Sequence, residues 1–295
     1  MSASDKSKLT RYPMDNKSSQ RIYLPYIYYK AIRDLQPVWE LEDMRTMETF
    51  YWDKQHRRIT LTPSEALLYA IVHNHQAYAQ YLLSHYSEKA LAVPSKYFFL
   101  IPASIPHFIM AVRYDRREIL ELMFQVTHQV PSLRACLGER VNFEDGKTPL
   151  HLACELMHVE TIILLLSNGV SPQAEDLNGM TPLDVILSQL WESEVNVEAK
   201  RRCLDNLLLF IPEIRFKMKG SLEEDRDRWT QVIGADTVNY LAGRTPAPLF
   251  LIAMQKVIRL LPSDRVLESL HQLPIPSSLR TLPVPGNHRE PSQTA

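Results

Sequence analysis

Residues 145–153 are DGKTPLHLA, and residues 178–186, which begin 33 positions later, are NGMTPLDVI. A short pattern that recurs at a fixed spacing indicates repeated supersecondary units. The glycine suits a turn with a positive φ angle. The proline suits the first turn of a helix, and the threonine hydroxyl before it can cap that helix. The matched residues are Gly146 with Gly179, Thr148 with Thr181, Pro149 with Pro182 and Leu150 with Leu183.

A 33-residue period that carries Thr-Pro-Leu-His-x-Ala is the signature of ankyrin repeats, and the chain therefore resembles that family. Leu150 and Ala153 lie three residues apart on one face of the first helix, where the small alanine lets helices approach closely. In the family, the position of His151 generally makes a structural hydrogen bond between turns. Residues 161–166, TIILLL, predict a second and more buried helix, and Gly169 suits the C′ position that ends it.

Two weaker copies lie upstream, and each has an alanine in the place of Ala153. Ala70 lies 41 residues before Ala111, and Ala111 lies 42 residues before Ala153, so these repeats carry insertions of about eight or nine residues over the usual 33. A fourth unit starts at Thr181, and its second helix is expected at Cys203–Phe210, after a polar stretch. Since about four stacked helix pairs can bury a continuous core, the sequence predicts an all-α ankyrin-repeat solenoid.

The segment before the repeats predicts two short helices, at 26–32 and 38–44, which Pro37 separates. Aromatic side chains such as Trp39 are costly to leave in water. Two interpretations remain open for this segment. It can form a helical cap that covers the first repeat, or it can present an aromatic patch to a partner.

The C-terminal third carries a second pattern. Residues 246–261, PAPLFLIAMQKVIRLL, predict a helix after a proline-rich start. Leu249, Ala253 and Val257 recur at i, i+4 and i+8 and form one apolar stripe, although other sides of this helix are apolar too. Such a helix is either buried in its own domain or docked on a partner. Residues 266–270 predict a further short helix, and the proline-containing run 273–279 predicts a stiff, extended loop.

This C-terminal region resembles a SOCS box, a helical module that follows many ankyrin arrays. The resemblance implies an elongin-binding helix and a downstream Leu-Pro-x-Pro element that contacts a cullin, of the cullin-5 type. Ala253 stands where the family usually has a cysteine, so the thiol that fills an elongin pocket is missing. The implied elongin-binding residues are Pro248, Leu249, Ala253 and Val257, and the implied cullin-binding residues are Leu273, Pro274, Ile275 and Pro276.

The chain also resembles one vertebrate family of ankyrin-repeat proteins over roughly residues 28–282. The motifs that carry this resemblance are AIRDL at 31–35, LEDMR at 41–45, PSEALLYA at 63–70, HQAYA at 75–79 and AVRY at 111–114. The resemblance implies the substrate-recognition subunit of a cullin-RING ubiquitin ligase, with elongin B and elongin C as adaptors. It also implies a client among the enzymes of purine nucleotide synthesis, with inosine monophosphate dehydrogenase as the candidate.

Composition bears on several other classes of function. The formal net charge of −1 gives no global attraction to nucleic acid or to an anionic membrane. Glycine is scarce, at 8 residues, and neither GxGxxG nor GxxxxGK[ST] occurs. The 3 cysteines are scattered and suggest neither a disulfide framework nor a metal site. No signal peptide and no apolar stretch of membrane-spanning length is evident. We therefore expect a cytoplasmic protein without catalytic residues, metal or cofactor.

The alternative to a ligase receptor is a non-catalytic scaffold that binds a metabolic enzyme without ubiquitination, in which Leu249, Ala253 and Val257 only close the end of the array. The two hypotheses differ in whether that stripe is open to solvent. The predicted organisation is a disordered tail at 1–20, a helical cap at 21–60, ankyrin repeats at 61–212, a helical connector at 213–245, a SOCS-box-like segment at 246–282 and a disordered tail at 283–295.

Overall fold

The computed structural model describes residues 20–47, 51–52, 58–95, 106–130, 132–133, 144–262 and 266–274. In this part of the chain the fold is all-α, as predicted, apart from one short antiparallel ladder. The ladder pairs β1 (Tyr51–Trp52) with β2 (Arg58–Ile59). Two single turns of 3₁₀ helix, Ser87–Lys89 and Glu144–Gly146, lie in the loops.

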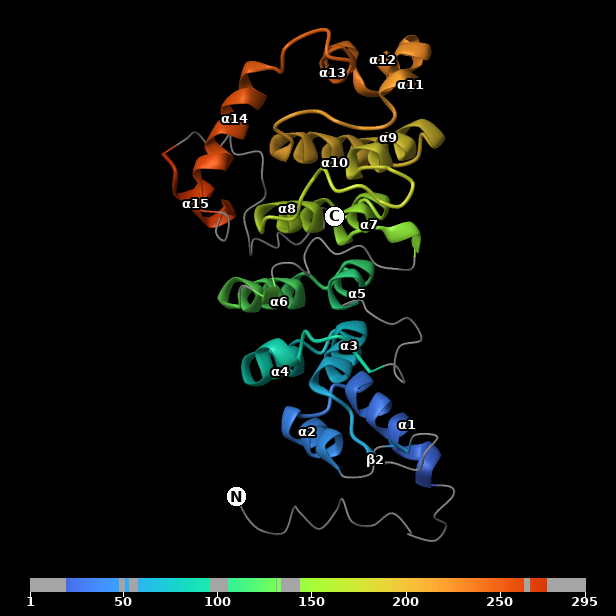
Figure 1. Cartoon of the computed structure of the whole chain (residues 1–295), viewed down its shortest axis with the longest axis vertical. Helices are drawn as coiled ribbons and strands as arrows, with labels where there is room; N and C mark the ends of the chain where they lie inside the picture. The colour runs from blue at the N-terminus through green and yellow to red at the C-terminus, as the bar shows by residue number, and fades with distance from the viewer. Residues whose placement is uncertain are drawn as a thin grey trace, which may run out of the picture.

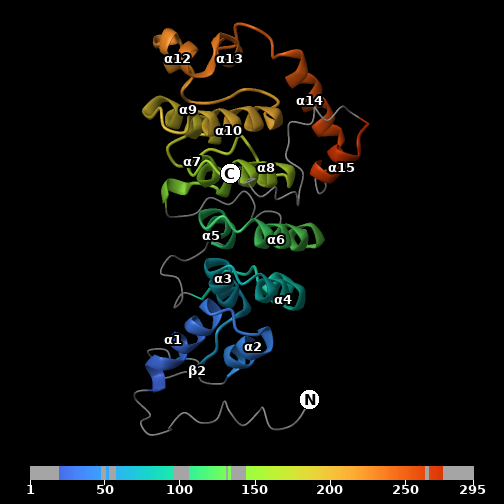
Figure 2. The same ribbon diagram turned by 180° about the vertical axis from the view of Figure 1, so that it is seen from behind.

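Ten helices form five stacked pairs along the long axis of the described molecule (Figure 1), and the same two columns are visible from behind (Figure 2). Along the stack, α3, α5, α7 and α9 contact one another in sequence. The first helices are α1 (Gln20–Arg33), α3 (Pro63–His73), α5 (His107–Arg113), α7 (Pro149–Glu155) and α9 (Pro182–Glu192). The second helices are α2 (Val38–Thr46), α4 (Gln76–Tyr86), α6 (Arg117–Gln129), α8 (Val159–Ser167) and α10 (Val197–Phe210).

Three of the first helices begin at the threonine-proline pair that the sequence pattern singled out. Thr62, Thr148 and Thr181 are N-cap residues, and in each case the next residue is a proline that begins the helix. Each threonine side chain accepts a hydrogen bond from the backbone N–H three residues on, and the side chain there bonds back to the cap. This capping box satisfies two backbone donors at each helix start.

The turn inside each of the first four pairs has the same backbone geometry. Four residues adopt the left-handed conformation, with φ between 50° and 57°. The residue after each of them donates its N–H to the carbonyl of an alanine five positions earlier, which is a Schellman-type helix end. The left-handed residues are Leu35, Asn74, Asp115 and Met157, and the alanines are Ala31, Ala70, Ala111 and Ala153.

This shared turn confirms the alignment of Ala70 and Ala111 with Ala153. It also shows that α1 and α2 are built around the same turn as the repeats, with Ala31 in the equivalent place. The alignment of Ala31 with Ala153 was missed in the sequence, because the segment around Ala31 lacks the Thr-Pro-Leu pattern. Tyr28, Ile32 and Leu41 from this pair are fully buried in the common core, whereas Trp39 is exposed.

The prediction for the last pair was wrong at its second helix. We expected this helix to begin at Cys203, but α10 begins at Val197, so the polar stretch 191–202 is helical except at residues 193–196. The buried Lys200 explains the difference, since its Nζ donates to the carbonyls of Gln189 and Ser193, both at 2.6 Å. These carbonyls lie at the end of α9, so the lysine ties the two helices together.

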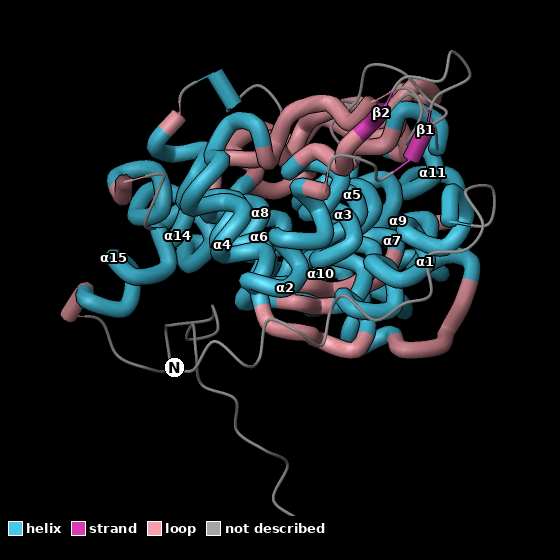
Figure 3. Tube along the Cα trace, turned by 90° about the horizontal axis from the view of Figure 1, so that it is seen from below, coloured by secondary structure: helices cyan, strands magenta, loops and turns pink. Residues whose placement is uncertain are grey.

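Five further helices follow the pairs: α11 (Lys219–Glu224), α12 (Arg226–Ile233), α13 (Ala235–Leu241), α14 (Leu249–Leu260) and α15 (Val266–Gln272). α12 contacts α9 at the end of the stack, and α14 packs on α10. Figure 3, which looks along the stack, shows α14 and α15 outside the second-helix column. One hydrophobic core runs from Tyr28 to Leu270, so these helices share the core of the array. Among the described helices, none has both the length and the apolarity to cross a membrane.

Candidate interaction surfaces

α14 has two faces with different environments. Leu251, Met254 and Ile258 are buried, at spacings of three and four residues. Gln255 is buried beside them, and its Nε2 donates to the carbonyl of Leu208 at 2.9 Å and to that of Ile211 at 2.7 Å. Because those carbonyls belong to the end of α10, this face anchors α14 to the array.

The opposite face of α14 is open to solvent and carries exposed apolar side chains beside the basic Lys256 and Arg259. Leu249 is 82% exposed, Leu260 is 76% exposed and Ile252 is 47% exposed. Ala253 is exposed as well, and Val257 is half-buried. This exposed stripe therefore contains the residues at which the SOCS-box resemblance implies elongin binding, with Pro248 exposed just before the helix. With its other face the helix packs against α10, beside the second-helix column.

The implied cullin-binding element lies only partly within the described chain. Val266 and Leu270 of α15 are buried, so this helix is packed down. Leu273 follows it, half-buried against the core, and Pro274 is exposed. Ile275 and Pro276 lie outside the described residues. A cavity of about 630 Å³ separates α15 from α6 and α8, and its polar lining includes Glu121, Gln125, Asn168 and Glu268.

The residues predicted to be structural in the repeats lie in turns with positive φ angles or are buried. Gly146, Gly169 and Gly179 have φ angles of 70°, 85° and 71°. A Cβ atom on Gly146 would lie 2.7 Å from Cγ of Leu177, so close packing as well as backbone conformation favours glycine there. The remaining members of the set, Thr148, Pro149, Leu150, His151, Ala153, Thr181 and Pro182, are all buried.

His151 links neighbouring repeats as expected. Its Nε2 lies 2.9 Å from the carbonyl of Met180, and its Nδ1 accepts from the backbone N–H of Thr148 at 3.2 Å. Asp184 holds the equivalent position in the next unit and accepts from the backbone N–H groups of Lys217 and Met218 at 3.1 and 2.7 Å. The same helix position therefore joins each unit to the chain that follows it.

A second set of links between pairs was missed in the sequence. After two of the left-handed turn positions, the next residue reaches back to the preceding pair. His75 Nε2 lies 2.9 Å from the carbonyl of Gln36, and Arg116 donates to the carbonyls of Ile71 and Val72, both at 3.0 Å. A histidine or arginine five residues after a buried alanine was the available signal.

The cysteines with described side chains are poor nucleophiles. Burial raises the pKa of Cys154 well above its usual value, with the neighbouring Cys203 thiol adding to the shift. Burial also raises the pKa of Cys203 to about 12. Both thiols therefore stay protonated near neutral pH and behave as core side chains. Within the described residues, no group of three His, Cys, Asp or Glu side chains is placed to hold a metal ion.

Comparison with known proteins supports the description of the repeats. The family model for ankyrin repeats, in three copies, matches residues 108–192, which span α5 to α9. A mouse (Mus musculus) protein, ankyrin repeat domain-containing protein 9, is 37% identical over an alignment of 289 positions, which covers 86% of this chain and 87% of the relative. The similarity therefore extends well beyond the repeats that the family model matches.

Proposed function

The chain belongs to the family of ankyrin repeat domain-containing protein 9, and from that membership we propose that it is the substrate-recognition subunit of a cullin-RING ubiquitin ligase. Ankyrin repeats are modules for protein interaction, typically without catalytic activity, and their stacked units offer an extended binding surface. In the proposed role the repeats hold a client, the stripe on α14 binds elongin B–elongin C, and the segment after α15 meets a cullin of the cullin-5 type.

The exposed stripe of α14 carries this proposal. Soluble proteins rarely leave a contiguous apolar helix face in water unless it binds something. Leu249 and Leu260 are among the most exposed apolar side chains in the described chain, yet α14 is already anchored through its opposite face. Covering the stripe would supply several kcal/mol at about 25 cal/mol per Å² of apolar surface.

The proposed mechanism makes or breaks no bond in this chain. Ubiquitination would follow from proximity, because a client lysine is held near a charged conjugating enzyme. α14 and α15 lie along the second-helix column and share one core with the repeats, so the ligase end and the client end would keep a stable distance. On the family resemblance, we propose inosine monophosphate dehydrogenase as the first client to test.

The test is capture of purified elongin B–elongin C by the wild-type chain and by a Leu249→Asp, Val257→Asp double variant. We expect the wild type to bind, and the variant to lose roughly 3 kcal/mol or more of binding free energy because two apolar contacts become charged. Circular dichroism and thermal melting on both chains check folding. The substituted side chains are exposed or half-buried, so the fold should persist.

A matched control replaces exposed apolar side chains away from α14. Leu177→Asp together with Val195→Asp changes the same chemistry at residues that are 69% and 67% exposed, and it should leave elongin capture unchanged. If the folded wild type captures no elongin, the ligase proposal fails and the scaffold alternative takes its place. An Ala253→Cys arm tests the missing thiol, and it should tighten binding by about tenfold, equivalent to roughly 1–2 kcal/mol.

A further inference from the structure

The identical turns of the first four helix pairs create a surface row that the proposed adaptor sites leave unused. Two residues precede each left-handed turn position, at the end of each first helix, and the stacking places them in register. We define the turn edge as these positions: Arg33 and Asp34, Val72 and His73, Arg113 and Tyr114, and Glu155 and Leu156.

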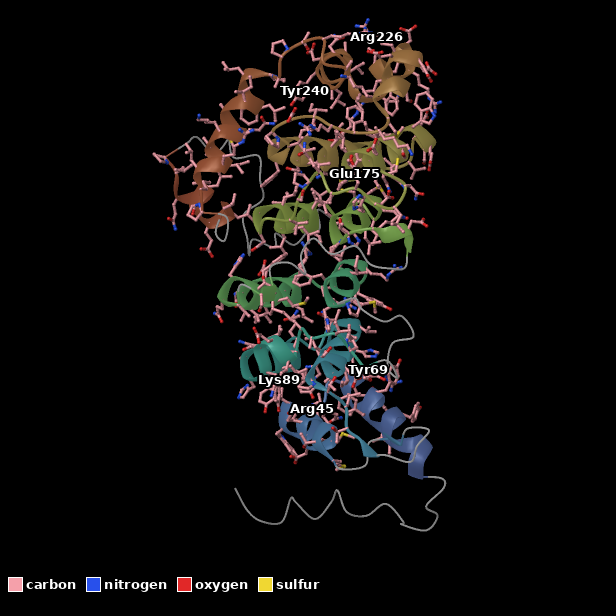
Figure 4. The ribbon with its side chains drawn as sticks, viewed as in Figure 1. Arg45, Tyr69, Lys89, Glu175, Arg226 and Tyr240 are labelled. Carbon is pink, nitrogen blue, oxygen red and sulfur yellow. The ribbon has the colours of Figure 1, made fainter. Side chains whose placement is uncertain are left out.

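Aromatic and aliphatic side chains are exposed along the turn edge. Tyr114 is 39% exposed and Leu156 is 37% exposed. Next to His73, the ring of Tyr29 lies edge-on at 4.8 Å between centroids and is 37% exposed. The ring centroids of Tyr29 and Tyr69 lie 6.3 Å apart. Figure 4 labels Tyr69 on the first-helix side of the stack. The row therefore offers exposed apolar contacts in the pairs that begin with α1, α5 and α7.

The same row is positively charged over its first three pairs. Residues 30–36, 72–76 and 113–117 contain five lysines and arginines but only two carboxylates. Both carboxylates are already engaged. Asp34 pairs with Arg33 at 2.8 Å, and Asp115 accepts from the Thr161 hydroxyl at 3.0 Å. Arg33 and Arg117 pair with these two carboxylates, Arg117 at 3.7 Å, and Arg116 donates to the carbonyls of Ile71 and Val72. Five cations against two carboxylates still leave an excess of positive charge for a ligand of negative charge.

His73 lies in the middle of this positive region. Its Nε2 is buried and has no hydrogen-bond partner within the described residues. Burial lowers the pKa of His73, and the charges of Arg33 and Arg116 lower it further, so the ring is neutral at pH 7. A buried polar atom without a partner is uncommon in folded proteins, and the neutral ring does not offset the positive charge of the arginines around it.

We propose that the turn edge over α1, α3 and α5 is the docking site for an extended, acidic segment of the client that also carries apolar side chains. This proposal rests on the receptor function above and names the partner chemistry that the receptor selects. Helices that pack together lie roughly 8–10 Å apart. An extended chain advances about 3.3 Å per residue. Every third residue of the bound segment would therefore meet a new turn, and about nine residues would cover the three pairs.

The test begins with a selection that leaves the ligand chemistry open. A phage-displayed library of random twelve-residue peptides is selected on the folded full-length chain, and the enriched sequences are counted. We expect enrichment of aspartate and glutamate together with aromatic or aliphatic residues. One enriched peptide is then synthesised with a fluorescent label, and its affinity is measured by anisotropy at two salt concentrations. Binding should weaken with salt, because exposed charges are screened.

An Arg33→Glu, Arg113→Glu variant should bind this peptide with an affinity lower by roughly tenfold or more, because glutamates then face the acidic residues of the peptide. The matched control is Lys89→Glu with Arg202→Glu, two exposed basic side chains away from the turn edge, of which Figure 4 labels Lys89 beside α4. The control should bind as the wild type does. Melting curves confirm that both variants fold.

Three outcomes would overturn the proposal: no enriched sequence, enrichment of neutral or basic peptides, or an acidic peptide whose affinity is unaffected by the reversal of Arg33 and Arg113. If the charge-reversed variant does not fold, the library result and the salt dependence with the wild type still decide. Elongin capture is measured separately on the same variant and should be unchanged. A failure of the docking site is therefore distinguishable from a failure of the receptor role.

Discussion

His107 is the first residue of α5 and is completely buried between two repeats. Its Nε2 lies 3.0 Å from the carbonyl of Ser64 and 3.2 Å from the hydroxyl of the same residue. Burial lowers the pKa of His107 to about 4, although the hydrogen bond to Ser64 opposes part of that shift. The neutral imidazole thus serves as a packing and hydrogen-bonding group that links α3 to α5.

The lowered pKa of His107 predicts a pH-dependent stability. Between pH 6.5 and about 4 the unfolded chain binds a proton at this histidine that the folded chain does not, so the free energy of unfolding falls as the pH falls. We expect a loss of roughly 2 kcal/mol from this residue between pH 7 and pH 5. Urea unfolding at both pH values measures it.

The control for this prediction is His107→Gln, which keeps a donor for the Ser64 carbonyl but does not titrate. Other histidines contribute equally to both chains, so the difference between them isolates His107. A variant with the same pH dependence as the wild type would show that this imidazole is not the group responsible.

At the scale of the helix, α14 shows how orientation depends on a few anchors. Its apolar residues occur on more than one side, so the face that packs is chosen by the partner it finds on α10. Gln255 is the polar anchor, because it pairs with two backbone carbonyls at the end of α10. The phenol of Tyr240, which Figure 4 labels beside α14, also interacts with Gln255.

Replacing Gln255 with leucine should loosen α14. The substitution leaves the carbonyls of Leu208 and Ile211 buried without this donor, at an expected loss of roughly 1–3 kcal/mol in the free energy of unfolding. Hydrogen exchange of residues 249–260 should become faster than in the wild type, with a smaller change in α3 to α8. Lys256→Leu is the control, since Lys256 is an exposed neighbour on the same helix. Equal exchange in both variants would contradict the anchoring role.

At the scale of the whole molecule, each end of the stack needs a cover, because a repeat buries its faces only against neighbours. At the N-terminal end, α2 contributes Arg45, whose side chain is only 8% exposed. Arg45 donates to Glu42 through Nε at 2.8 Å, to the Leu61 carbonyl at 2.9 Å and to the Tyr86 hydroxyl at 2.8 Å. Burial alone would raise the pKa of Glu42, but hydrogen bonds from Arg45 and Tyr86 outweigh it and hold this pKa below its usual value.

Arg45→Met should therefore destabilise the N-terminal end of the array. It leaves the Glu42 carboxylate half-buried without its cation, and breaking such a pair costs about 3 kcal/mol. Chemical denaturation measures the loss. Arg215→Met removes the exposed Arg215–Glu213 pair as a control and should change the stability by less than about 0.5 kcal/mol. A loss no larger than the control's would mean that the cap does not depend on this network.

The local features of the fold could be predicted from the sequence. The threonine caps and the glycines of the turns act on backbone groups within a few residues, so the sequence alone reveals them. Their recurrence from residue 145 to residue 178 gives the repeat period. The stripe for which the SOCS-box resemblance implies elongin binding was also visible as a helical spacing. The role of each stripe residue remains a proposal.

Three features depended on the tertiary structure. The start of α10 depends on Lys200, whose side chain reaches the end of α9. The inclusion of α1 and α2 in the stack depends on a backbone turn at Ala31 and Leu35, which residue types as common as alanine and leucine do not predict. The exposed side of α14 is the third. A helix with apolar residues on more than one side does not reveal which face will be buried, because that choice is made by the long-range contacts that only the folded chain brings together.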